Sequence, residues 1–115
     1  MKRYIPTILA IAVTILTPKA GVNWFNDGLT VHKETYYNLS MNRVVSNAHE
    51  KGLVGEYWVR EDGVKMFGPC AIVAANQQMH PYGSLVFTSR GMGIVLDTGA
   101  FAASNHEQYD IAVEW

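Results

Sequence analysis

The chain has 115 residues, of which 49% are hydrophobic, so it has room for one domain with a modest core. Beyond the first 20 residues, six Lys and Arg face ten Asp and Glu, a net charge of −4 that argues against a nucleic-acid partner, which would need a basic surface. Cys70 is the only cysteine, so no disulfide within the chain can stabilise the domain and the core must do so.

The first 20 residues are typical of a secretory signal peptide. They start with Lys2-Arg3 after the initial methionine and continue, up to Thr17, with uncharged and mostly apolar residues. This apolar run is short for a membrane span, which needs ~20 apolar residues. Because Pro18 lies where a cleavage site favours a small residue, an uncleaved membrane anchor and a buried strand or helix are the alternatives. We therefore expect a secreted or cell-envelope protein that contacts a membrane only through an uncleaved N-terminus.

The next part of the chain predicts a linker and one helix. Residues 21–37 are mixed and polar, with a turn signal at Asp27, and are expected to lead into the fold as a linker. From residue 38 to residue 51 the apolar residues recur near helical spacing, and Gly52 can end the helix.

After Gly52, short apolar runs alternate with turn signals, as in an all-β domain. Six strands are expected, over residues 55–60, 64–67, 70–75, 84–88, 92–96 and 109–115. No long amphipathic crossover separates them, which favours closure into a small barrel. The predicted fold class is mainly β: a small six-stranded barrel with one short helix before or beside it, in a domain of residues 38–115.

Two aspartates lie beside apolar runs near the C-terminus. Asp97 follows residues 93–96, and Asp110 stands between Tyr109 and Ile111. In partly buried surroundings, desolvation and a neighbouring carboxylate can raise the pKa of one acid and leave the other ionised. The pair can therefore support acid–base chemistry without a metal or cofactor. Alternatively, both aspartates could accept hydrogen bonds from backbone amides at turns or strand crossings.

An ordered set of motifs between Gly68 and Trp115 resembles the three-aspartate (3D) domain. In chain order the motifs are AIVAAN, HPYGS, GMG, LDTG and YDI, which begin at residues 71, 80, 91, 96 and 109. That family is a double-psi β-barrel of six strands, related to the C-terminal domain of membrane-bound lytic transglycosylase A and to rare lipoprotein A. The resemblance implies the same barrel here. It also implies cleavage of the peptidoglycan glycan strand between N-acetylmuramic acid and N-acetylglucosamine, with a 1,6-anhydro sugar as product.

The resemblance also implies roles for individual residues. Asp110 matches the family's proposed general acid and base, and Asp97 matches the aspartate that tunes or orients it. The expected substrate-binding residues are Asn76, Tyr82, Thr98 and Gly99. The implied partner is the glycan strand of peptidoglycan, with no cofactor and no metal, and we expect a monomer.

Two departures from the family pattern keep a second function open. Asn76 stands where the family's first aspartate is expected, and neither the family's second glycine nor its lysine follows Gly99. These losses favour a non-catalytic glycan-binding module of the cell envelope, whereas the retained Asp97 and Asp110 favour an enzyme. A hydrolase that activates water with the same two carboxylates is a further chemical alternative.

Other chemistries have weaker support in the sequence. The Asp-Thr-Gly motif at residues 97–99 also occurs in aspartic proteases, but the sixteen residues after it are too few for the flap and second psi element of such proteases. His80 and His106 could join the aspartates in a metal site, although no paired-histidine spacing supports one. Cys70 opens an apolar run, so a buried structural cysteine is expected.

Overall fold

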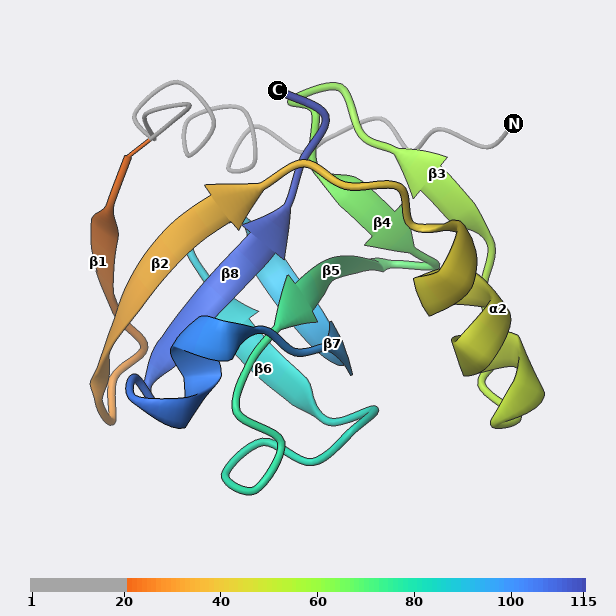
Figure 1. The fold of residues 1–115 in the computed structure, drawn as a ribbon. Coiled ribbons are helices and arrows are strands. Elements are labelled where there is room, and N and C mark those ends of the chain that lie inside the picture. The colour runs from red at the N-terminus through yellow and green to blue at the C-terminus, as the bar shows by residue number, and fades with distance from the viewer. Residues whose placement is uncertain (1–20) are drawn as a thin grey trace.

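The computed structural model describes residues 21–115, which fold into a mainly β structure (Figure 1). The predicted signal peptide lies outside the described residues. The predicted fold class is confirmed at this level: strands dominate, and the described part of the chain adds one α-helix and a short 3₁₀ helix. None of the helices in residues 21–115 is long and apolar enough to cross a membrane.

All six predicted strands are present, as is the predicted helix. The strands are β3 (Tyr57–Val59), β4 (Lys65–Phe67), β5 (Cys70–Ala74), β6 (Leu85–Thr88), β7 (Gly91–Asp97) and β8 (Gln108–Ala112). Helix α2 (Asn42–Glu50) lies within the predicted range. It ends just before Gly52, whose φ of +90° favours glycine. The 3₁₀ helix η1 (Ala100–Ala103) lies between β7 and β8.

The prediction of a linker over residues 21–37 is wrong. These residues form two further strands, β1 (Asn23–Asn26) and β2 (Val31–Tyr37), which pair as an antiparallel hairpin. The hairpin lacks the usual apolar alternation because the buried positions of β2 include two polar residues, His32 and Glu34. Hydropathy alone therefore conceals the strand.

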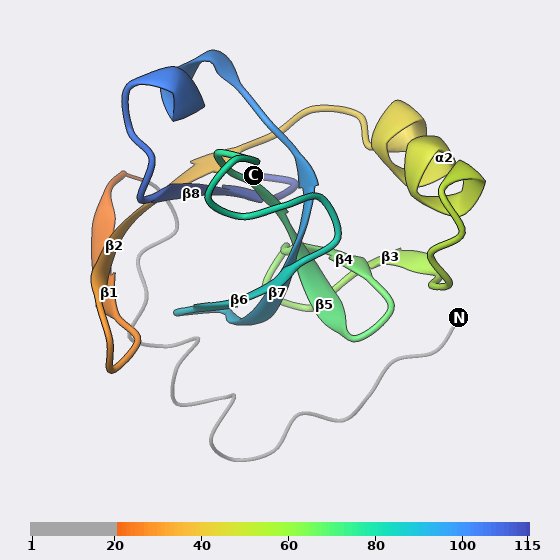
Figure 2. The same ribbon diagram turned by 90° about the horizontal axis from the view of Figure 1, so that it is seen from below.

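The eight strands form one curled sheet, seen from two directions in Figures 1 and 2. Its main order is β1-β2-β8-β5-β4-β3, and β7 joins it by pairing with β5 and with β6. Two of the pairs are parallel, β2 with β8 and β5 with β7. Within residues 21–115, strands β1, β3 and β6 each pair with a single neighbour, so the sheet has open edges. The structure thus has eight strands rather than the six predicted, and closure into a barrel is not seen.

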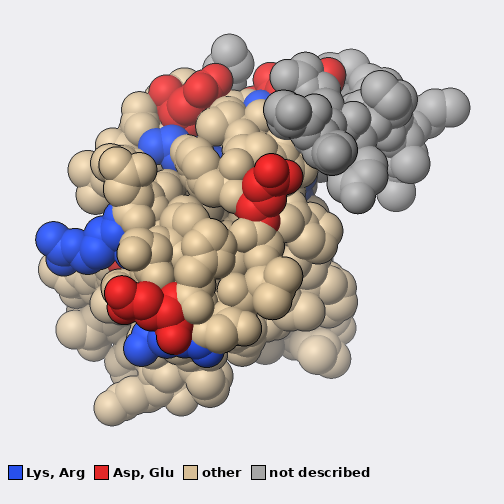
Figure 3. All heavy atoms as spheres, turned by 90° about the vertical axis from the view of Figure 1, so that its right-hand side faces the viewer, with Lys and Arg blue, Asp and Glu red and all other residues tan. Residues whose placement is uncertain are grey.

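Two apolar clusters lie on opposite faces of the sheet. Successive residues of a strand point to opposite faces, so Val73 of β5 and Ile111 of β8 join the first cluster, whereas Ile72 and Ala112 join the second. Helix α2 contributes Ala48 to the second cluster. On the side of the molecule shown in Figure 3, acidic and basic side chains are scattered among uncharged ones.

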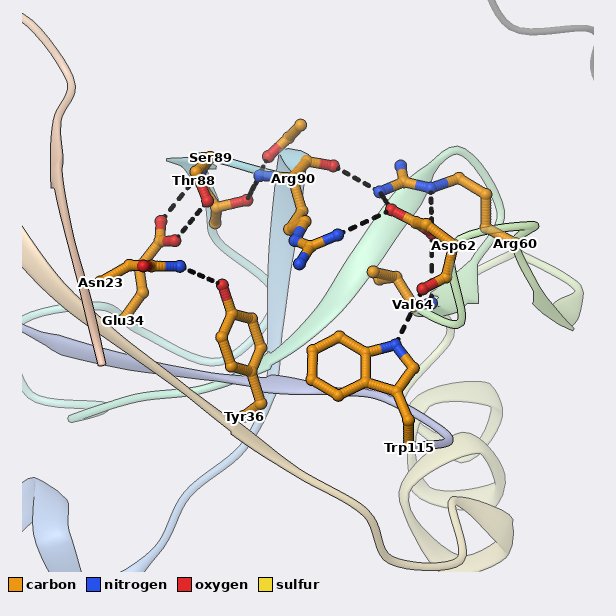
Figure 4. Close-up of polar contacts among 11 residues, drawn as sticks. Asn23, Glu34, Tyr36, Arg60, Asp62, Val64, Thr88, Ser89, Arg90 and Trp115 are labelled. Carbon is orange, nitrogen blue, oxygen red and sulfur yellow. Dashed lines mark hydrogen bonds and ion pairs between the residues drawn. The ribbon is translucent and has the colours of Figure 1, made fainter. Parts of the chain in front are cut away.

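A polar network ties four distant segments together at the edge of the first cluster (Figure 4). Asp62, in the β3–β4 turn, accepts two hydrogen bonds from Arg60 at 3.0 and 2.9 Å and pairs with Arg90 at 3.3 Å. The Arg90 guanidinium lies 5.4 and 5.6 Å from the ring centroids of Tyr36 and Trp115. Trp115 Nε1 donates to the Asp62 carbonyl at 2.8 Å. The network therefore connects β2, the β3–β4 turn, the β6–β7 turn and Trp115.

Candidate active site

Asp97 and Asp110 lie on either side of Ala74 in the sheet. Ala74 of β5 pairs with Asp97 at the end of β7 and, on its other side, with Asp110 of β8. Thr35 of β2 pairs in turn with Asp110. Paired residues point to the same face of a sheet, so these four residues form a row across four strands. We call it the aspartate row; within it, only the methyl group of Ala74 stands between the two acids.

A β-bulge turns Asp97 toward this face. The pairing of β5 with β7 passes from Val73–Val95 directly to Ala74–Asp97, so Leu96 is an extra residue in β7. In a regular strand, Asp97 would point to the same side as Val95, which lies two residues earlier and is fully buried in the first cluster. The bulge therefore places Asp97 on the face that carries Asp110.

The half-buried Asp110 carboxyl is held on one side only. Thr35 Oγ1 donates a hydrogen bond to Asp110 Oδ1 at 2.8 Å, and Oδ2 has no hydrogen-bond partner among residues 21–115. Burial raises the pKa of Asp110 above its usual value, the Thr35 hydrogen bond opposes this rise, and the negative charge of Asp97 adds to it. The net effect favours the protonated acid more than at an exposed aspartate.

Asp97 has a different environment, because both of its oxygens accept hydrogen bonds. Tyr37 donates its hydroxyl to Oδ2 at 2.8 Å, and the backbone N–H of Thr98 donates to Oδ1 at 2.9 Å. Burial, and then the charge of Asp97, raise the pKa of Tyr37, so this phenol stays protonated and remains a donor. Each Asp97 oxygen therefore already accepts one hydrogen bond from the protein.

The sequence reasoning missed Tyr37 and Thr35 because both lie in the segment taken for a linker. Their side chains share one face of β2, since they are two residues apart. The strand would be evident from the alternation of the buried His32 and Glu34 with less buried residues, but hydropathy does not show that these two polar residues are buried.

Asn76 holds a loop. Its Oδ1 accepts hydrogen bonds from the backbone N–H groups of Gln78 and Met79 at 3.0 and 2.9 Å, and its Nδ2 donates to the carbonyl of Ala102 at 3.0 Å. The side chain is 9% exposed. These bonds tie the loop after β5 to η1 and explain why an amide, which can both donate and accept, stands here. A substrate-binding role for Asn76 stays a prediction.

The other three predicted binding residues lie beside the aspartate row. Tyr82 packs its ring against the second cluster, with Lys51 Nζ 5.2 Å from the ring centroid. The buried Tyr82 hydroxyl has no hydrogen-bond partner among residues 21–115, and burial followed by the charge of Asp97 raises its pKa. Thr98 and Gly99 are exposed and directly follow Asp97. The ring of Tyr82 is thus partly covered by packing, and the only link between its hydroxyl and the aspartate row is the effect of the Asp97 charge on its pKa.

The histidines lie elsewhere. His80 contacts Tyr109 and His32, with ring centroids 5.3 and 6.3 Å away. His32 is 3% exposed and its Nε2 lies 2.8 Å from Asp27 Oδ2. Because Tyr109 neighbours Asp110 on β8, it points to the opposite face of the sheet. Within the described residues, no group of three or more His, Cys, Asp or Glu is placed to hold a metal ion.

Two further observations bear on ligands and relatives. A hollow of about 280 Å³ lies along edge strand β3, lined by residues 56–59, and contains neither aspartate.

Comparison of the chain with known protein families, with curated proteins and with solved structures gives no match. The resemblance to the three-aspartate domain therefore rests on the motifs alone, and function has to be argued from the aspartate row.

Proposed function

We propose that this chain cleaves the glycan strand of peptidoglycan by lytic transglycosylation, with Asp110 as general acid and base and Asp97 as its partner. The observation that carries the proposal is the aspartate row, in which two carboxyl groups face the same side across Ala74 in unequal environments. Such unequal environments are how enzymes assign different roles to two carboxyl groups. The motif resemblance supplies the substrate class.

Asp110 is the better acid of the two on geometric grounds. Its Oδ2 is free of hydrogen bonds to residues 21–115, and burial raises its pKa, whereas both oxygens of Asp97 are engaged. In the proposed reaction, Asp110 gives its proton to the glycosidic oxygen as the bond from that oxygen to the muramoyl C1 breaks. The negative charge of Asp97 stabilises the positive charge that develops on the sugar.

The second half of the reaction restores the acid. The muramoyl 6-hydroxyl attacks C1 and its proton passes to the Asp110 carboxylate, so the new C1–O6 bond closes a 1,6-anhydro ring. The bonds and protons balance, and no water is consumed. The products are a strand ending in the anhydro sugar and a strand with a free N-acetylglucosamine 4-hydroxyl.

The test is digestion of purified peptidoglycan with the full chain, followed by mass spectrometry of the released fragments. We expect 1,6-anhydro muropeptides from the wild type and a loss of about 10²–10⁴-fold in their rate of release for Asp110→Asn. Glu50→Gln, which changes an exposed carboxylate on α2, is the matched control and should release fragments at the wild-type rate.

Three results would contradict the proposal, and each names another function. Binding to peptidoglycan without any cleavage indicates a glycan-binding module. Reducing ends that contain oxygen from labelled water indicate a hydrolase. Cleavage of protein that pepstatin blocks indicates an aspartic protease.

A further inference from the structure

We propose that Gln108 and Thr35 form a hydrogen-bond relay that places the acidic proton of Asp110 on Oδ2, the oxygen that accepts no hydrogen bond from residues 21–115. This inference rests on the proposed function in one respect, that the Asp110 proton is the one transferred to substrate. The relay itself concerns three side chains and can be tested on the resting protein. Thr35 and Gln108 are positioning residues, since they act on Asp110 and do not touch the reacting atoms.

The direction of the relay follows from its first donor. Gln108 Nε2 donates to Thr35 Oγ1 at 2.8 Å, and Thr35 Oγ1 donates to Asp110 Oδ1 at 2.8 Å. A hydroxyl has a single hydrogen, and an amide NH₂ group can only donate. Because the Gln108 NH₂ group cannot accept the Thr35 hydrogen, that hydrogen is directed to its other partner, Asp110 Oδ1.

The consequence for Asp110 is a defined proton position. An oxygen that accepts a hydrogen bond from Thr35 serves as the carbonyl oxygen when the carboxyl group is protonated, so the proton resides on Oδ2. No donor or acceptor among residues 21–115 competes for Oδ2. The proton is therefore on the oxygen left available to a glycosidic oxygen, without a rearrangement before transfer.

The sheet makes the relay rigid. Gln108 and Asp110 lie on the same face of β8, and Thr35 of β2 is paired with Asp110 in the parallel ladder, so Gln108 reaches Thr35 along the diagonal. Gln108 is only 7% exposed, and the β-branched Thr35 has few accessible rotamers. A buried glutamine at this position is otherwise unusual, because long polar side chains are mostly exposed.

The test measures the pKa of the Asp110 carboxyl group by ¹³C NMR on the full chain, with the signal assigned by its loss in Asp110→Asn. Thr35→Val keeps the shape of the side chain and removes the hydroxyl, so the pKa of Asp110 should rise, because the ionised form loses a hydrogen bond. Thr35→Ser keeps the hydroxyl and should restore the wild-type pKa. Gln108→Met, which leaves Thr35 in place but free to rotate, should give a smaller rise. Thr88→Val removes a buried hydroxyl at the end of β6 and should leave the pKa of Asp110 unchanged.

The outcomes separate the relay from the proposed function. The relay is overturned if Thr35→Val and Gln108→Met shift the pKa of Asp110 no more than the control Thr88→Val does. This conclusion holds even if the wild type releases anhydro muropeptides. A rise in Thr35→Val that Thr35→Ser reverses supports the relay, even if the wild type cleaves nothing and the proposed function fails. If Thr35→Val does not fold, Gln108→Met alone decides, because it leaves the β2 side of the ladder intact.

Discussion

At the scale of single residues, the role of a polar side chain depends on the hydrogen-bond donors and acceptors around it. Asp97 and Asp110 differ because one has two donors and the other has one. Asn76 differs from an aspartate because it donates to the Ala102 carbonyl as well as accepting from the backbone. The departure at Asn76 is thus accounted for by the loop and does not by itself remove a group from the aspartate row.

Replacing Asn76 by aspartate should destabilise this protein. Asn76→Asp places a carboxylate oxygen against the Ala102 carbonyl, which lies 3.0 Å from the present donor, and should lower the free energy of unfolding by about 1–3 kcal/mol. Urea denaturation measures the difference. Asn105→Asp, at an exposed position between η1 and β8, should change it by less than about 0.5 kcal/mol. Equal stability of Asn76→Asp and wild type would show that the amide does not secure the loop.

At the scale of elements, the β1–β2 hairpin is the piece on which the candidate site depends. Strand β2 supplies Thr35 and Tyr37 to the aspartates and pairs in parallel with β8 over five residue pairs. The turn of the hairpin is organised by Asp27, whose Oδ1 accepts hydrogen bonds from the N–H groups of Leu29 and Thr30 and whose Oδ2 contacts His32. The hydrogen bonds of Asp27 therefore help to hold β2, and with it Thr35 and Tyr37, in place.

The hairpin should loosen at acid pH. The backbone hydrogen bonds from Thr30 and Leu29, with a smaller contribution from His32, lower the pKa of Asp27 from 3.8 to about 2. A lowered pKa in the folded state means that ionised Asp27 contributes stability above pH 3.8 and that this contribution is lost as the pH falls toward 2. Amide hydrogen exchange should show β1 and β2 opening before α2 over this range.

A charge-neutral turn provides the control for this pH effect. Asp27→Asn keeps an acceptor for the turn amides but has no proton to take up, so the exchange rates of the hairpin should become independent of pH between 4 and 2, after correction for intrinsic exchange. A wild-type hairpin that opens no earlier than α2 would contradict the proposed role of Asp27.

At the scale of the whole molecule, the two faces of the sheet have separate tasks. The first cluster packs on one face and is bordered by the network of Asp62, Arg90 and Trp115, whereas the aspartate row lies on the face that α2 partly covers. The polar network and the aspartate row therefore lie on opposite sides of the same sheet, although each side also carries an apolar cluster. A substitution in the network should reduce stability without altering the pKa of Asp110.

Asp62→Ala tests this separation. The side chains of Asp62 and Arg90 are 5% and 2% exposed, so removing the carboxylate leaves a buried guanidinium without this ion pair. The free energy of unfolding should fall by about 1.5–3 kcal/mol, the range for hydrogen bonds to charged groups. Glu56→Ala, at an exposed position, should change it by less than about 0.5 kcal/mol. If Asp62→Ala lowers the free energy of unfolding no more than Glu56→Ala does, the network of Asp62 and Arg90 does not stabilise the fold.

Most strands and the helix can be predicted from local signals in the sequence. The six strands after Gly52 and helix α2 follow from apolar runs, turn residues and helical spacing, and Asp97 and Asp110 could be selected because each stands beside an apolar run. Hydropathy failed for β1 and β2, because His32 and Glu34 occupy buried positions whose partners come from distant parts of the chain.

The assembly of the site depends on contacts between distant segments. Thr35 meets Asp110 across 75 residues and Tyr37 meets Asp97 across 60, and both contacts depend on the non-local pairing of strands. The bulge at Leu96, which turns Asp97 to the same face as Asp110, has no local signature, because it is defined by the register of β7 against β5. Strand register is a property of two segments at once, so no single stretch of sequence contains it.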